Sequence, residues 1–116
     1  GFLVKMEPTL VENPEIRIEK RSFAGQQGEY KEFDFPRLYN ELVRLKEKFP
    51  KESTINIGAE FGIMWRDIAR TIDSARTRLA KDSYEYLPEY GTAEPKLNKD
   101  KEPEVMFPNV VFVVVD

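Results

Sequence analysis

Two amphipathic helical patterns, separated by strand patterns, constrain the fold of this chain more than any other feature of its sequence. In each pattern apolar residues recur at alternating intervals of three and four, which places them on one face of a helix. The apolar face of the first pattern comprises Phe35, Leu38, Leu42, Leu45 and Phe49. The apolar face of the second, which follows Gly62, comprises Trp65, Ile68, Ile72, Ala75 and Leu79. We therefore predict two helices that bury these faces, Trp65 included.

The ends of the first helix are marked by residues that start and stop helices. Asp34 is a good N-cap, and Pro36 lies in the first turn, where its missing N–H costs nothing. Phe49 precedes Pro50, and the residue before a proline is disfavoured in the α conformation. These signals predict a helix that ends at Phe49.

Strand patterns lie before, between and after the two helices. Residues 15–23 and 29–33 flank a turn with two glycines and predict a hairpin, and residues 53–60 predict a third strand. Residues 109–116 are apolar without alternation, so we expect them to form a strand that is central or covered on both faces. The order hairpin–α–β–α–β predicts an α+β fold, a mixed β-sheet with two α-helices packed on one face.

The 116 residues are enough for one domain, which we place at residues 15–116. Residues 1–14, with two prolines and one short apolar stretch, are interpreted as a lead-in linker that could contain a short strand. Residues 80–106 contain three prolines and no apolar period, so we predict a long, mobile surface loop inserted in the domain. Its tyrosines at positions 84, 86 and 90 could dock on the domain or on a partner.

The composition argues against several kinds of chemistry. Histidine and cysteine are absent, which removes thiol nucleophiles, histidine acid–base catalysis and Cys/His zinc sites. The net charge is −3, whereas a nucleic-acid-binding domain is expected to be basic. The phosphate-binding, dinucleotide-binding and nucleophile-elbow motifs are also missing. We therefore predict no catalytic, cofactor-binding or metal-binding residue, with a small two-carboxylate hydrolase as a distant alternative.

No segment of the sequence is long and apolar enough to span a membrane. The longest apolar run, residues 110–115, has six residues, whereas a spanning helix needs about 20. Because the chain begins at Gly1 rather than at a methionine, we expect the natural protein to extend further at its N terminus, where a membrane anchor would lie.

The second helix and the hairpin carry the candidate partner-binding residues. Asp73 and Arg76 lie one helical turn apart, which suits either a surface ion pair or a partner contact. The basic excess of this helix could face an anionic partner or simply keep the surface soluble. The hairpin strand offers an edge that could pair with an extended segment. The candidate residues are Ile16, Ile18, Arg66, Arg70, Asp73 and Arg76.

Four stretches of the chain agree in order and spacing with a known pattern. They are residues 35–50 (FPRLYNELVRLKEKFP), 55–60 (INIGAE), 65–76 (WRDIARTIDSAR) and 106–112 (MFPNVVF). They resemble the periplasmic domain of the ExbD/TolR family of biopolymer-transport proteins. Ala59-Glu60, Trp65 and Ile72-Asp73 stand where that family usually has Ala-Asp, Tyr and Met-Asp, while Arg76 matches. The resemblance covers residues 15–79 and 106–116 and leaves 80–105 unmatched.

The resemblance implies a non-catalytic component of a machine driven by the proton motive force. It implies the same fold, a homodimer, an ExbB/TolQ-like channel protein as partner, and capture of a TonB/TolA-like transducer segment. It also implies a location on the periplasmic side of the bacterial inner membrane, anchored by an N-terminal transmembrane helix that this chain lacks. The alternative within the family, which includes a gliding-motility relative, is a stator domain that binds peptidoglycan.

Overall fold

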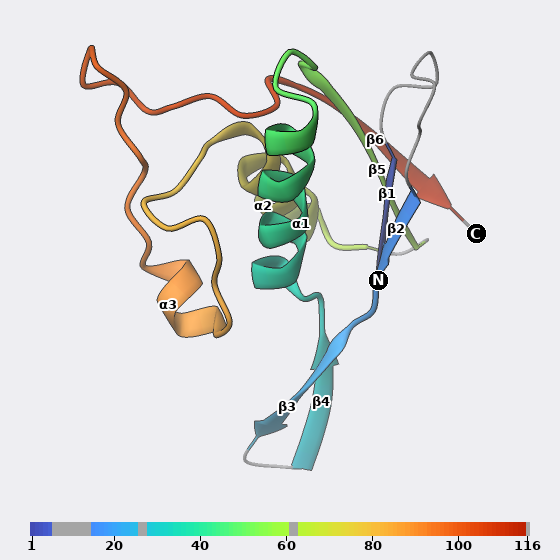
Figure 1. Ribbon diagram of the computed structural model, residues 1–116. Helices are drawn as coiled ribbons and strands as arrows, with labels where there is room; N and C mark the ends of the chain where they lie inside the picture. Colours follow the sequence, from blue (N-terminus) through green and yellow to red (C-terminus); the bar gives the residue numbers. More distant parts are fainter. Residues whose placement is uncertain (6–14, 26–27, 61–62, 116) are drawn as a thin grey trace.

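A computed structural model of the protein describes residues 1–5, 15–25, 28–60 and 63–115. The elements in this part of the chain are β1 (Phe2–Lys5), β2 (Glu15–Ile18), β3 (Arg21–Gly25), β4 (Gly28–Glu32), α1 (Phe35–Lys48), β5 (Thr54–Glu60), α2 (Trp65–Arg76), α3 (Leu87–Gly91) and β6 (Asn109–Val115). Four strands form a mixed sheet, and α1 and α2 lie on one side of it (Figure 1). The predicted α+β fold is therefore confirmed, with α3 as a short additional helix.

The four-stranded sheet has the order β2-β1-β5-β6. Strand β1 is antiparallel to both β2 and β5, whereas β6 is parallel to β5, with α2 in the connection between them. Residues 2–5, predicted as part of the lead-in, thus lie inside the sheet, which begins at Phe2 rather than at residue 15. The rest of the predicted lead-in, residues 6–14, lies outside the described residues.

The predicted hairpin is divided between two sheets, so the expectation of one continuous strand over residues 15–23 was wrong. Strand β2 ends opposite Phe2, where Ile18 pairs with it, and β3 begins three residues later in a separate ribbon with β4. The sequence contains the reason. Ile16 and Ile18 share one face of a strand, but Phe23 is an odd number of positions further and would fall on the opposite face. Figure 1 shows the β3–β4 ribbon projecting away from the main sheet.

Helix α1 forms at the position that its end signals predict. The Asp34 side chain accepts a hydrogen bond from the Arg37 N–H at 3.1 Å, and Phe49 closes the helix with its N–H on the Leu45 carbonyl. The buried side includes Phe35, Leu38, Tyr39, Leu42, Val43 and Leu45. This face forms the centre of the core, against the sheet residues Val4, Ile55 and Ile57.

Helix α2 buries only part of the predicted face. Trp65 is 76% exposed, so the prediction that it packs in the core was wrong. The buried residues of α2 are Asp67, Thr71, Ser74 and Ala75. Periodicity identified the apolar side of the helix, but α2 also contacts α1 and β6, and this packing covers the small polar side chains. The first helical position, Trp65, extends beyond that packed region.

Strand β6 is at an edge of the sheet, which corrects the expectation that it would be central or covered on both faces. In the described part of the chain it pairs with β5 alone. Val111, Val113 and Val114 are each about half exposed. A parallel strand–helix–strand connection explains why β6 lies beside β5. A run of valines indicates a high propensity for β structure. It does not indicate whether the strand pairs with one neighbouring strand or with two.

The first part of the predicted mobile loop, residues 80–106, is docked on the helices. Tyr84 is 4% exposed, and its ring lies 5.7 Å from that of Tyr39 on α1. Asn40 holds the backbone of Tyr84 at both ends: its Nδ2 donates to the Tyr84 carbonyl and its Oδ1 accepts from the Tyr84 N–H. In Figure 1 the segment with α3 lies on the side of α1 away from the sheet. The segment lacks an apolar period because a few tyrosines anchor it.

Candidate functional site

The side of the sheet opposite the helices forms the first candidate surface. Alternation along the strands places Leu3, Lys5, Asn56, Gly58, Val111 and Val113 on this open face. Leu3, Gly58 and Val113 lie in one row across three strands. Because Gly58 has no side chain, a hollow of about 180 Å³ lies in this region, lined by Leu3, Val113 and their neighbours. The open face is therefore partly apolar and hollowed at its middle.

The predicted edge residues Ile16 and Ile18 lie on β2, which is indeed an outer strand of the four-stranded sheet. Their side chains, however, face the core: Ile18 is 1% exposed and Ile16 packs against the buried cluster. A partner at β2 would therefore pair with the backbone of this strand rather than contact these side chains, and the partner-binding assignment stays a prediction. What β2 offers a partner is its backbone, since within the described residues it pairs on one side only, with β1.

The four predicted residues on α2 separate into two groups. All four residues are exposed, but Arg70 and Asp73 line a pocket of about 540 Å³, whereas Arg66 and Arg76 lie outside it. Among the described contacts Asp73 and Arg76 form no ion pair, so the surface-pair interpretation was wrong. Arg66 lies 3.9 Å from the carboxylate of its neighbour Asp67, a weak contact at the start of the helix.

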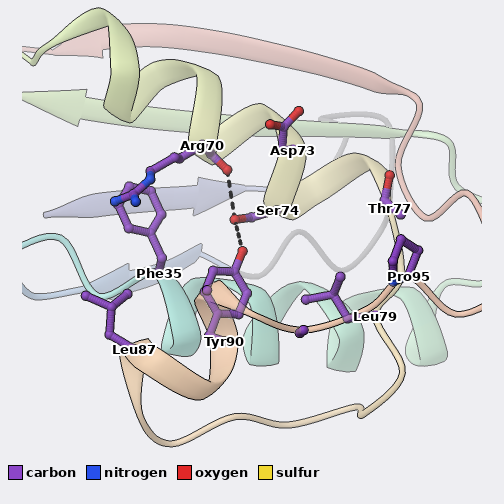
Figure 2. Close-up of a pocket in the computed structure, with 11 residues that line it drawn as sticks. Phe35, Arg70, Asp73, Ser74, Thr77, Leu79, Leu87, Tyr90 and Pro95 are labelled. Carbon is purple, nitrogen blue, oxygen red and sulfur yellow. Dashed lines mark hydrogen bonds between the residues drawn. The ribbon is translucent and has the colours of Figure 1, made fainter.

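The pocket between α2, α3 and the segment after α3 has a volume of about 540 Å³ (Figure 2). We call it the α2–α3 pocket. Its lining residues are Phe35, Arg70, Asp73, Ser74, Thr77, Leu79, Leu87, Tyr90, Gly91, Ala93 and Pro95. The volume falls within the roughly 300–1,000 Å³ typical of small-ligand sites. Sequence reasoning found only two of these residues, because the pocket exists only once the insertion docks.

A chain of hydrogen bonds fixes the centre of this pocket. The Ser74 hydroxyl donates to the Arg70 carbonyl at 2.8 Å, so the Tyr90 hydroxyl is the donor in its contact with Ser74 Oγ (Figure 2). Burial raises the pKa of Tyr90. Tyr90 therefore stays a neutral hydroxyl and joins α3 to α2.

Arg78 fixes the other end of the insertion. Its guanidinium contacts Glu47 at 2.9 Å, Asp82 at 3.0 Å and Glu104 at 3.8 Å, which joins α1 to both ends of the insertion. Burial alone would lower the pKa of Arg78, but the hydrogen bonds that its guanidinium donates to Asp82 and Glu47, together with the charge of Glu104, raise it overall. The three acidic partners of Arg78 come together only in the tertiary structure.

Asp73 is the single carboxylate among the lining residues of the α2–α3 pocket, so this pocket does not supply the carboxylate pair of a glycosidase. In the described part of the chain, His, Cys, Asp and Glu side chains form no group of three that could hold a metal ion. Within the same residues, no helix has the length and hydropathy needed to cross a bilayer.

Comparison with known proteins gave no relative. No protein-family model, curated protein or solved structure matches this chain.

Proposed function

We propose that this chain is a non-catalytic, partner-binding domain of a membrane machine driven by the proton motive force, similar to the periplasmic domain of ExbD/TolR proteins. The observation that carries the proposal is the open face of the sheet, with its apolar row Leu3–Gly58–Val113 beside the outer strand β6. The order α1–β5–α2–β6 and the sequence resemblance in these elements support the family.

In this proposal the partner is an extended segment of a TonB/TolA-like transducer. Strand β6 has a strand on one side only in the described residues, so an added strand could continue the sheet through main-chain hydrogen bonds. The half-exposed Val111 and Val113 would then be covered by alternate side chains of that segment. Homodimerisation, association with an ExbB/TolQ-like channel protein, and anchoring at the periplasmic side of the inner membrane belong to the same proposal.

The test is a nuclear magnetic resonance titration of the isotope-labelled chain with the periplasmic segment of a TonB-like or TolA-like transducer. We expect saturable shifts in the backbone amides of residues 109–114 and of Phe2–Lys5. Val113→Lys should abolish these shifts by placing a charge in the apolar row. Val105→Lys is the matched control, because Val105 is 60% exposed and lies in the insertion, away from β6.

Either of two results would contradict the proposal. The first is the absence of saturable shifts with both transducer segments. The second is binding that Val113→Lys and Val105→Lys weaken equally. Sedimentation of the chain with peptidoglycan sacculi at moderate salt, without transducer binding, would instead favour the stator function.

A further inference from the structure

Arg70 is positioned in the α2–α3 pocket without an acidic partner. In the described part of the chain no carboxylate forms an ion pair with its guanidinium, although Asp73 lies one helical turn away. The guanidinium instead lies over the ring of Phe35, with its central carbon 5.7 Å from the ring centroid (Figure 2). A guanidinium placed over an aromatic ring can still direct its planar N–H donors at a carboxylate.

The side of the pocket beside Arg70 is formed by the fully buried Phe35 and by Leu87 (Figure 2). Leu79, Ala93 and Pro95 are further apolar residues of the lining. Tyr39 and Ser74 hold the surrounding segments in place through the Leu79 N–H and the Tyr90 hydroxyl. The pocket is thus already formed, so a ligand would not have to order it.

The charges in the pocket select the ligand. Arg70 is its one cation, and Asp73 is its one anion. Asp73 would repel a multiply charged group such as a phosphate, so a single carboxylate suits the site better. The apolar wall further requires that the carboxylate be attached close to an apolar group. At the end of a polypeptide the carboxylate and the last side chain share one carbon atom, whereas the carboxylate of an internal Asp or Glu is attached to a methylene that carries no further side chain.

We propose that the α2–α3 pocket binds the C-terminal carboxylate of a polypeptide whose last side chain is apolar, with Arg70 as the carboxylate ligand. This inference rests on the proposed function in taking a polypeptide as the partner. The two sites are on different sides of the molecule: the pocket lies among the helices and the insertion, and strand addition would occur on β6 (Figure 1).

The test uses two short peptides that differ only at the terminus, acetyl-glycyl-glycyl-leucine and its C-terminal amide, titrated into the isotope-labelled chain. We expect the acid to shift the amides of Ser74, Gly91 and Ala93. We expect the amide to bind at least about tenfold more weakly, because a charge-assisted pair with Arg70 is lost. Shifts in these amides, rather than in residues 109–114, distinguish this site from strand addition, so each proposal can fail alone.

Substitutions on α2 supply the controls. Arg70→Gln should remove the preference for the acid over the amide, and Arg70→Lys, which keeps the charge but loses the planar fork, should retain only part of it. Arg76→Gln changes the same charge on an exposed part of the same helix and should leave the preference intact. Equal binding of acid and amide, no saturable binding of the acid at millimolar concentration, or an unchanged preference in both Arg70 variants would overturn the inference.

Discussion

Tyr39 on α1 and Leu79, forty residues later, are joined by a hydrogen bond in which the Leu79 N–H donates to the Tyr39 hydroxyl oxygen at 2.8 Å. The same hydroxyl donates to the Lys81 carbonyl at 2.9 Å, and the tyrosine is completely buried. One side chain therefore satisfies two backbone groups at the start of the insertion. Its ring also packs on those of Tyr84 and Tyr90, at centroid distances of 5.7 and 5.8 Å.

Tyr39→Phe should destabilise the protein. The substitution keeps the ring packing but leaves the Leu79 N–H and the Lys81 carbonyl without their partner, which costs about 1–3 kcal/mol of unfolding free energy. Urea denaturation followed by circular dichroism measures this loss. Tyr86→Phe, at a tyrosine that is 54% exposed, is the control and should change stability by less than about 0.5 kcal/mol. An equal effect of the two substitutions would show that the Tyr39 hydroxyl is not structural.

Stability should fall at alkaline pH through the same residue. Burial raises the pKa of Tyr39 from 10.0 to about 12, with the Leu79 hydrogen bond acting in the opposite direction. Because the folded state holds the proton more tightly than the unfolded state, this contribution is complete below pH 10 and is lost as the pH rises toward 12. The limiting slope for one group is about 1.4 kcal/mol per pH unit.

The comparison of Tyr39→Phe with the wild type isolates this term. Urea midpoints measured between pH 9 and 12 should decline more steeply for the wild type, since the variant lacks the titrating hydroxyl. The pKa of Tyr90 is also raised by burial, but Tyr90 is present in both proteins, so its contribution cancels in the comparison. Parallel declines would rule out Tyr39 as the source of alkaline sensitivity.

Two valines of the four-stranded sheet should respond to the same substitution to very different degrees. Val4 on β1 is fully buried, whereas Val113 on β6 is 47% exposed on the open face. Val4→Thr places a hydroxyl in the core and should cost about 1–3 kcal/mol of unfolding free energy. Val113→Thr should change it by less than about 0.5 kcal/mol. Chemical denaturation checks both values, and a large loss for Val113→Thr would mean that this face is covered.

Arg78→Met should loosen the insertion without unfolding the domain. The acidic partners Glu47 and Asp82 are more than half exposed, so the ion pairs contribute only about 1 kcal/mol or less to global stability. The local effect should be clearer in hydrogen exchange, with faster exchange at the Ala80, Lys96 and Glu104 amides, which bond across the insertion.

Arg44→Met is the control for that experiment. Arg44 is 71% exposed and pairs only with Glu41 on its own helix among the described contacts, so its loss should not alter exchange in the insertion. Unchanged exchange in Arg78→Met would instead indicate that the tyrosine contacts alone hold the segment.

The sequence alone determined the elements whose signals are local. Asp34 and Pro50 define α1 because capping and proline geometry act within a few residues. Alternation over residues 53–60 gave β5, and the strand–helix–strand spacing gave its parallel pairing with β6. The mixed sheet with two helices on one face follows from this order. The family resemblance and the partner-binding function remain predictions.

The tertiary structure decided which faces of the helices and strands are buried, and which elements cover them. Periodicity shows that Trp65 and Ala75 share a side of α2, but packing against α1 and β6 buries only Ala75. The valine run of β6 lies at an edge of the sheet, and the start of the insertion docks on α1. Both placements depend on contacts with residues far away in the chain. The candidate residues Arg70 and Asp73 line the α2–α3 pocket, whose far wall comes from residues between Leu87 and Pro95. Local sequence patterns specify faces, whereas burial depends on contacts between distant residues.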